Sequence, residues 1–145
     1  MHRGVEYASS PSDPQIEFAH KVIDAGANFV IGHHPHVPQG IEIYTAKPNS
    51  PSFAPGSIGA TEGERVERKG IIFYSLGNFA FWQPFDYWTQ HTFAVELTLK
   101  SDGKFDHTII PINSGWQPKL SDEIDQVKIK DYIAKLSEKL NLSNS

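Results

Sequence analysis

The sequence has no cysteine among its 145 residues, which excludes disulfides, cysteine-ligated zinc, iron–sulfur clusters and a thiol nucleophile. It has no apolar run near the roughly 20 residues that a membrane helix requires, and its first six residues lack the apolar segment of a signal peptide. It also lacks a glycine-rich phosphate loop and a Gly-x-Ser-x-Gly nucleophile motif. We therefore predict a chain that is soluble by itself and has neither kind of site.

Positive charge is sparse as well. Lysine and arginine number 13 against 17 aspartates and glutamates, giving a net charge of −4 at pH 7. The largest basic cluster is Arg65, Arg68 and Lys69, whereas nucleic-acid binding normally needs a concentrated positive patch. We therefore expect no nucleic-acid partner. The hydrophobic fraction of 39% is sufficient for a core, which argues against disorder of the whole chain.

The pattern of apolar residues predicts an α/β domain. A helix should begin at Asp13, with this residue as its cap and Pro14 in the first turn, and should end at Gly26. A buried strand, 29–31, follows and ends at Gly32. A last amphipathic helix is expected over 123–140, with an apolar side made of Ile124, Val127, Ile133, Leu136 and Leu140.

Further strands are predicted around 41–43 and 71–74, and a hairpin should join 93–99 to 105–112 through a turn at 101–103. Nine of the 25 residues from 45 to 69 are proline, glycine or serine, so this segment is expected to be an exposed insertion. The predicted organisation is a main domain over 1–118 and a C-terminal helix and tail over 119–145.

Three of the seven histidines stand in one short run, Gly32-His33-His34-Pro35-His36-Val37. Imidazole binds zinc, manganese and iron well, and side chains two positions apart in an extended loop can point the same way. The run also follows a buried strand, where ligand-binding loops lie in α/β sheets. The alternative is a loop of solvated histidines, but the clustering favours a metal or phosphate site.

Several motifs together carry a family resemblance: His2-x-Gly4-x-Glu6-Tyr7, the run from Gly32 to Val37, and Tyr74-Ser75-Leu76-Gly77-Asn78-Phe79. In this order they resemble the capsule-synthesis CapA family of poly-γ-glutamate biosynthesis proteins, which are related to calcineurin-like metallophosphoesterases. The match extends from His2 to about Phe81, and more weakly to Ile112. It implies the C-terminal part of a four-layer α/β/β/α sandwich with mixed sheets and a metal site at the strand ends.

The resemblance also implies the ligands. His2 matches the single histidine of the superfamily, and His34 and His36 match its late pair, with His33 in place of His34 if the register shifts by one. The expected ions are manganese, zinc or iron, with room for two. His34 and His36 would be the catalytic residues, acting on a phosphoester without a protein nucleophile. Position 3 departs from the family, because Arg3 stands where tryptophan is usual.

In the superfamily, carboxylate and asparagine ligands precede the single histidine, which here is residue 2. We therefore expect the chain to be the C-terminal portion of a longer protein. Without those upstream ligands the metal should be held weakly. The side that the missing part would cover should be open, so self-association through it is expected.

Two further residues are candidates for binding substrate. Glu6 follows His2 by four positions and could orient an imidazole or contact substrate, or it could be a solvated carboxylate. Asn78 could bind substrate or serve only a Gly-Asn turn. His20 and His107 are expected to be structural or solvated, and His91 is left open. The aromatic stretch 79–88 could line a groove, but a lid packed on the core is favoured.

Three functions remain in view. The first is synthesis or export of a capsule polymer such as poly-γ-glutamate, with a metallophosphoesterase-like site. The second is a non-catalytic accessory domain that binds the polymer, and the third is a general metal-dependent phosphoesterase. The partners implied are an anionic polymer or phosphoester and a membrane-bound synthase complex. The full-length protein would then lie at the cell envelope, outside the cytoplasm.

Overall fold

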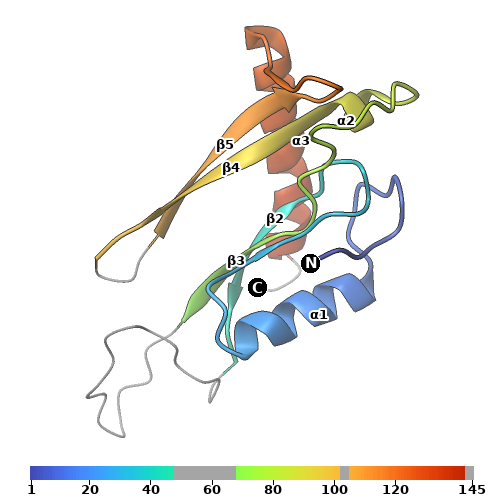
Figure 1. Ribbon diagram of the computed structural model, residues 1–145. Helices are drawn as coiled ribbons and strands as arrows, with labels where there is room; N and C mark the ends of the chain where they lie inside the picture. The colour runs from blue at the N-terminus through green and yellow to red at the C-terminus, as the bar shows by residue number, and fades with distance from the viewer. Residues whose placement is uncertain (48–67, 102–104, 143–145) are drawn as a thin grey trace, which may run out of the picture.

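The computed structural model describes residues 1–47, 68–101 and 105–142. Residues 48–67 of the predicted insertion and most of the predicted turn at 101–103 lie outside this part. The elements, in chain order, are α1 (Asp13–Asp24), β1 (Phe29–Ile31), β2 (Ile41–Thr45), β3 (Lys69–Phe73), α2 (Tyr87–Gln90), β4 (His91–Leu99), β5 (Phe105–Asn113), β6 (Lys119–Leu120) and α3 (Glu123–Leu142) (Figure 1).

The strands form two sheets of different kinds. The first has the order β1-β3-β2, with β1 parallel and β2 antiparallel to β3. The second is antiparallel, with the order β4-β5-β6. The predicted α/β class with mixed sheets is confirmed, whereas the four-layer arrangement stays a prediction. Thr45 and Lys69, placed in the insertion by sequence, are paired ends of β2 and β3.

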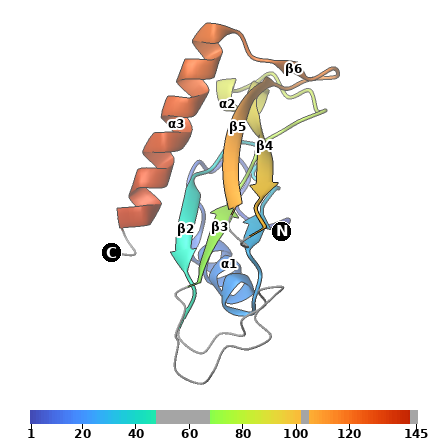
Figure 2. The same ribbon diagram turned by 90° about the vertical axis from the view of Figure 1, so that its left-hand side faces the viewer.

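Each face of the first sheet buries a separate apolar cluster. On one face α1 contributes Ala19 and Ile23, which pack against Val30 and Ile72. On the other face Phe73 packs against residues of β4 and α3. Figure 2 shows the backbones of these elements in a second view. Alternation along β3 explains the two faces, because successive residues of a strand point to opposite sides. β1 therefore packs against α1 through Val30, while its last residue, Ile31, is exposed.

The cap of the first helix lies one residue earlier than predicted. Ser12 is the cap, with extended backbone and no capping hydrogen bond from its side chain. Asp13 is therefore the first helical residue rather than the cap, and its carboxylate lies where the helix dipole favours negative charge. Pro14 lies in the first turn as predicted.

The apolar side of α3 was predicted correctly at Ile133 and Leu136 but incorrectly at Ile124 and Val127. Ile124 and Val127 are 68% and 60% exposed, whereas Ile129, Ile133 and Leu136 are buried. These three residues have the i, i+4, i+7 spacing of one helical face. Val127 lies two positions before Ile129, and two positions turn a helix by about 200°, to the opposite side. In the part of the chain that the structure describes, no helix has both the length and the apolarity to cross a membrane.

Side chains of α3 cap the outer edge of β2. The Ile41 amide donates to Ser137 Oγ at 2.8 Å, and the Ile43 amide donates to Asn141 Oδ1 at 3.1 Å. Asn141 Nδ2 in turn donates to the Ile41 carbonyl at 3.3 Å. Edge strands normally present such groups unpaired. Here a helix satisfies them.

Replacing Ser137 and Asn141 together with alanine should lower the free energy of unfolding by about 2 kcal/mol, because two amides of β2 lose their acceptors. Urea unfolding followed by circular dichroism measures the change. The control replaces the exposed Lys135 and Lys139 with alanine, which also raises helix propensity, although by less, and leaves the edge capped. Equal stability of the two double variants would contradict the role of this cap.

Candidate metal site at the end of β1

The site is built from two chain segments that run side by side. The N-terminal segment pairs in parallel with the loop after β1, through the bridge between His2 and His33. The His33 amide donates to the Met1 carbonyl at 2.8 Å, and the Arg3 amide donates to the His33 carbonyl at 3.1 Å. These bonds bring His2 beside the histidine run, which begins 31 positions later in the sequence at His33.

Three residues of the site have left-handed backbone, which is uncommon outside glycine. They are Tyr7, His34 and His36, with φ angles of 62°, 108° and 65°. Such conformations cost about 1–3 kcal/mol each and persist where the surroundings enforce them. Here the Tyr7 amide donates to the Pro35 carbonyl at 2.8 Å and ties the two segments together. The histidine loop is therefore tightly turned, and not extended as the sequence argument assumed.

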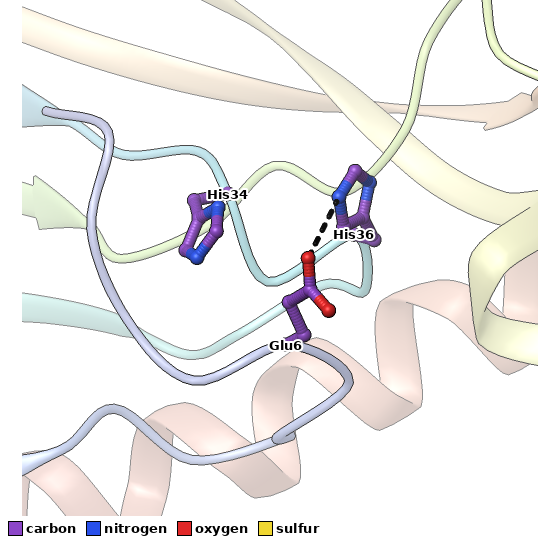
Figure 3. A group of neighbouring side chains, drawn as sticks. All are labelled: Glu6, His34 and His36. Atoms are coloured by element: carbon purple, nitrogen blue, oxygen red, sulfur yellow. Dashed lines mark ion pairs between the residues drawn. The ribbon is translucent and has the colours of Figure 1, made fainter.

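This geometry brings a carboxylate to two imidazoles. Glu6, His34 and His36 each offer one ligand atom, and these atoms all lie within 4.8 Å of one another. Figure 3 shows Glu6 reaching from the N-terminal loop toward both rings. Its Oε1 atom lies 4.0 Å from His36 Nε2. Glu6, predicted to orient an imidazole or bind substrate, thus stands among the candidate ligands themselves.

The other two predicted ligands lie nearby. The rings of His2 and His34 are 4.7 Å apart between centroids. A cavity of about 240 Å³ is lined by His2, His33, His34, His36, Gly77, Asn78, Phe79 and Phe81. Its lining therefore includes all four predicted histidines. His2 and His33 line this cavity but do not belong to the group of three close ligand atoms. They are therefore placed to contact a molecule bound in the cavity.

The pKa of His33 lies below its usual value. Partial desolvation of the ring is the main cause, and the positive N-terminal amino group adds to it. Both effects disfavour the protonated ring. His33 therefore tends toward the neutral form, which can donate one hydrogen bond and accept another.

Asn78 is buried directly behind His36. Its Oδ1 atom lies 2.8 Å from His36 Nδ1, and its Nδ2 atom donates to Gln83 Oε1 at 2.9 Å and to the Thr89 carbonyl at 3.1 Å. The Thr92 hydroxyl donates to the Asn78 carbonyl at 2.7 Å. Asn78 is only 7% exposed. These four contacts are all with the protein, so the substrate role assigned to Asn78 from sequence stays a prediction.

The aromatic stretch is mostly open to solvent. The favoured expectation of a lid packed on the core holds for Trp88, which stacks on Tyr132 with centroids 3.6 Å apart. It is wrong for four large side chains that are about half exposed: Phe79, Phe81, Trp82 and Phe85. Phe81 approaches the His36 ring at 5.8 Å. The segment after β3 thus presents apolar rings beside the cavity.

The remaining histidines serve structural contacts. His20 lies 2.8 Å from the buried carboxyl group of Glu42. His91, left open by sequence, stacks on Tyr87 and forms an ion pair with Asp125 at 3.2 Å. His107 contacts the ring of Phe73 edge-on.

Two glutamines support the site in roles that the sequence did not predict. Gln39 is fully buried, and its amide donates to the Ala8 carbonyl at 2.8 Å, which fixes the end of the N-terminal loop. Gln83 bonds both Asn78 and Tyr7. A single glutamine in a loop carries no signal of such a role, and the N-terminal partners Ala8 and Tyr7 lie 31 and 76 positions away from Gln39 and Gln83.

The family model for the bacterial capsule synthesis protein PGA_cap matches residues 1–83. The chain belongs to this family. The PGA biosynthesis protein CapA of Bacillus subtilis is 31% identical over 98% of the chain and 31% of its own length. The capsule biosynthesis protein CapA of Bacillus anthracis is 34% identical over 77% of the chain and 21% of its own length.

A third relative is a probable polyglutamine synthesis accessory protein of Mycobacterium tuberculosis, 50% identical over 50 residues, which are 33% of the chain and 13% of the relative. The resemblance to the CapA family is thus confirmed. The chain spans only between a fifth and a third of the length of the two Bacillus relatives. The PGA_cap match covers the whole candidate metal site, from His2 to Phe81.

Proposed function

We propose that the chain acts in the synthesis of a capsule polymer of the poly-γ-glutamate kind, and that Glu6, His34 and His36 bind a divalent metal ion in that role. Membership of the PGA_cap family supports the first part, together with relatives named for capsule and PGA biosynthesis. The second part rests on one observation. Two imidazoles and a carboxylate present their ligand atoms within 4.8 Å of one another.

The three residues fit such an ion by chemistry and by size. Imidazole and carboxylate together suit zinc, manganese and iron. Ligands about 2.1 Å from an ion can be at most about 4.2 Å apart. The pair of His36 Nε2 and Glu6 Oε1 meets this limit at 4.0 Å, and the three ligand atoms all lie within 4.8 Å of one another. The Glu6 side chain is 55% exposed, so it can turn by the small amount that coordination requires.

A bound divalent ion would supply Lewis-acid polarisation of a phosphoryl oxygen. The protein's own residues would do the rest. His34 and His36 would hold the ion, and Glu6 would add the negative charge. His2 and His33 line the same cavity and could donate ring N–H groups to the anionic oxygens of a phosphoester. This is the metallophosphoesterase-like activity that we propose for the site.

A second candidate is a non-catalytic accessory role in which the chain binds the polymer. The half-exposed rings beside the cavity favour it, because such rings can pack against the methylene groups of a glutamate polymer. Among the described residues, the donor group also holds a single carboxylate. Two-metal hydrolytic sites generally need more negative charge to keep two ions close together.

Titration of the metal-free chain with Mn²⁺ or Zn²⁺ by calorimetry should show one bound ion. His36→Ala should weaken binding by more than about 100-fold, since loss of even an outer partner costs about 10–100-fold. Glu6→Gln should weaken it as well, because the ligand set loses its negative charge. His107→Gln is the control, since His107 lies on β5 and lines no part of the cavity.

The same proteins should then be assayed with a nitrophenyl phosphodiester and with immobilised poly-γ-glutamate. Metal-dependent turnover that is lost in His36→Ala would support the phosphoesterase. Retention of polymer without turnover would support the accessory role. Equal metal affinity of the wild type and His36→Ala would overturn the proposed metal site.

A further inference from the structure

His36 makes a defined contact through each of its ring nitrogens. Nδ1 lies 2.8 Å from Asn78 Oδ1, within hydrogen-bond distance. Nε2 lies on the other side of the ring, 4.0 Å from Glu6 Oε1. A neutral imidazole carries its single proton on one nitrogen only, and the contact made by one nitrogen decides the state of the other.

The orientation of the Asn78 side-chain amide is set by a backbone carbonyl, which can only accept hydrogen bonds. Asn78 Nδ2 lies 3.1 Å from the Thr89 backbone carbonyl. That carbonyl also accepts from the Ser114 hydroxyl at 3.0 Å. If the amide were flipped, its oxygen would face this carbonyl and both atoms would be acceptors. The amide oxygen must therefore face His36.

We infer that Asn78 is a positioning residue that fixes His36 as the Nδ1–H tautomer and so keeps the Nε2 lone pair directed at the space shared with Glu6. The Asn78 oxygen can only accept, so His36 Nδ1 must donate. This inference rests on the proposed function, because a free Nε2 matters only if the site binds a metal. In the opposite tautomer Nε2 would carry a proton and could not ligate an ion.

A chain of contacts joins this arrangement back to the ligand loop. Gln83 accepts from Asn78 Nδ2, and its own Nε2 donates to the Tyr7 hydroxyl at 3.2 Å. The Tyr7 ring stacks on His36, with centroids 5.8 Å apart and planes 29° apart. Tyr7 directly follows Glu6 in the chain. The contacts that set the tautomer thus also hold the ring and the carboxylate loop in place.

The tautomer can be read directly from a long-range ¹H–¹⁵N correlation spectrum of the metal-free chain, recorded at alkaline pH where imidazole is neutral. His36 should show the pattern of the Nδ1–H form, and His36→Gln identifies its signals. His20 is an internal control of the opposite kind. Its Nε2 faces the Glu42 carboxyl group at 2.8 Å, so it should show the Nε2–H form.

Asn78→Leu should return His36 to the Nε2–H form that free imidazole prefers, and should weaken Zn²⁺ binding by about 10–100-fold. Asn78→Asp should keep the Nδ1–H form, because it retains an acceptor opposite Nδ1. Gln83→Met leaves Asn78 in place but removes one of the two acceptors of its amide. It should shift only part of the His36 population, and it serves as the test if Asn78→Leu does not fold.

The results separate this inference from the proposed function. An Nε2–H form of His36 in the wild type would overturn the inference even if metal binds. An unchanged tautomer in Asn78→Leu, with His20 signals showing an intact fold, would also overturn it. An Nδ1–H form that depends on Asn78, in a chain that binds no metal, would leave the inference standing and overturn the metal site.

Discussion

Gly32→Ala should unfold the chain or displace the histidine loop, lowering the free energy of unfolding by about 4 kcal/mol or more. A Cβ atom at Gly32 would lie 2.0 Å from the Tyr74 carbonyl oxygen and 2.9 Å from that of Phe73. Both atoms belong to the backbone, which cannot turn aside as a flexible side chain could. Gly32 also donates to the Phe73 carbonyl at 2.7 Å, so its position is fixed within the sheet. Urea unfolding measures the loss.

A second glycine provides the matched control for this prediction. A Cβ atom at Gly115 would come no closer than 3.5 Å to its nearest neighbour, the Trp82 ring, although the φ angle of 153° is strained for alanine. Gly115→Ala should therefore cost only about 1–2 kcal/mol. Similar losses in the two variants would show that close packing against β3 is not what requires Gly32.

Glu42→Leu should lower the free energy of unfolding by about 3 kcal/mol, although leucine has a similar volume. Glu42 is fully buried and accepts from the Tyr74 hydroxyl, and its other oxygen lies 2.8 Å from His20 Nε2. Leucine would leave both of these groups without an acceptor in the interior, where an unmet hydrogen bond is costly. Glu42→Gln retains an acceptor for Tyr74 and should lose much less. The double variant Glu42→Leu with Tyr74→Phe should recover part of the loss.

The contact between Tyr74 and Glu42 also predicts that the free energy of unfolding depends on pH. Burial, and then the hydrogen bond to Glu42, raise the pKa of Tyr74 far above its usual value. Unfolding therefore releases the Tyr74 proton once pH exceeds about 10, the ordinary pKa of tyrosine. The stabilisation is complete below that pH and is lost as pH rises above it. Unfolding measured between neutral and strongly alkaline pH should show a shallower decline for Tyr74→Phe, and equal slopes would contradict this coupling.

Local sequence signals were sufficient to predict an element when the residues of that element alone carry its pattern. The run 29–31 is apolar and ends at a glycine, and it forms β1 with the histidine loop directly after it. Alternation also predicted the hairpin of β4 and β5. Two short elements, α2 and β6, were missed. The four residues of α2 and the two residues of β6 are too few to show a hydrophobic period.

The sequence singled out the histidines of the candidate site as ligands, but Glu6 only as a residue that orients an imidazole or binds substrate. Clustering of His34 and His36 is visible in the sequence, whereas Glu6 approaches them in a fold where the next residue, Tyr7, has left-handed backbone. Nothing in the side chain of a tyrosine indicates such a turn. The contact of Asn78 with His36 likewise spans 42 positions. Partners so distant are set by the packing of β1 beside β3, which a local pattern does not contain.

The prediction that Ile124 and Val127 lie on the buried side of α3 was wrong for a related reason. Apolar residues occur on more than one side of this helix, and periodicity alone cannot say which side meets the sheet. Contact with β2 and β4 decides it, and it selects Ile129 and Ile133 over Ile124 and Val127.

The capped edge of β2 also limits how this molecule can be extended by other chains. An incoming peptide that adds to a sheet needs a row of free amides and carbonyls. At β2 that row is already engaged by Ser137 and Asn141, so a peptide strand could dock there only after α3 had detached. β-Augmentation at this edge would therefore require partial unfolding. In the native state α3 therefore blocks growth of the first sheet beyond β2.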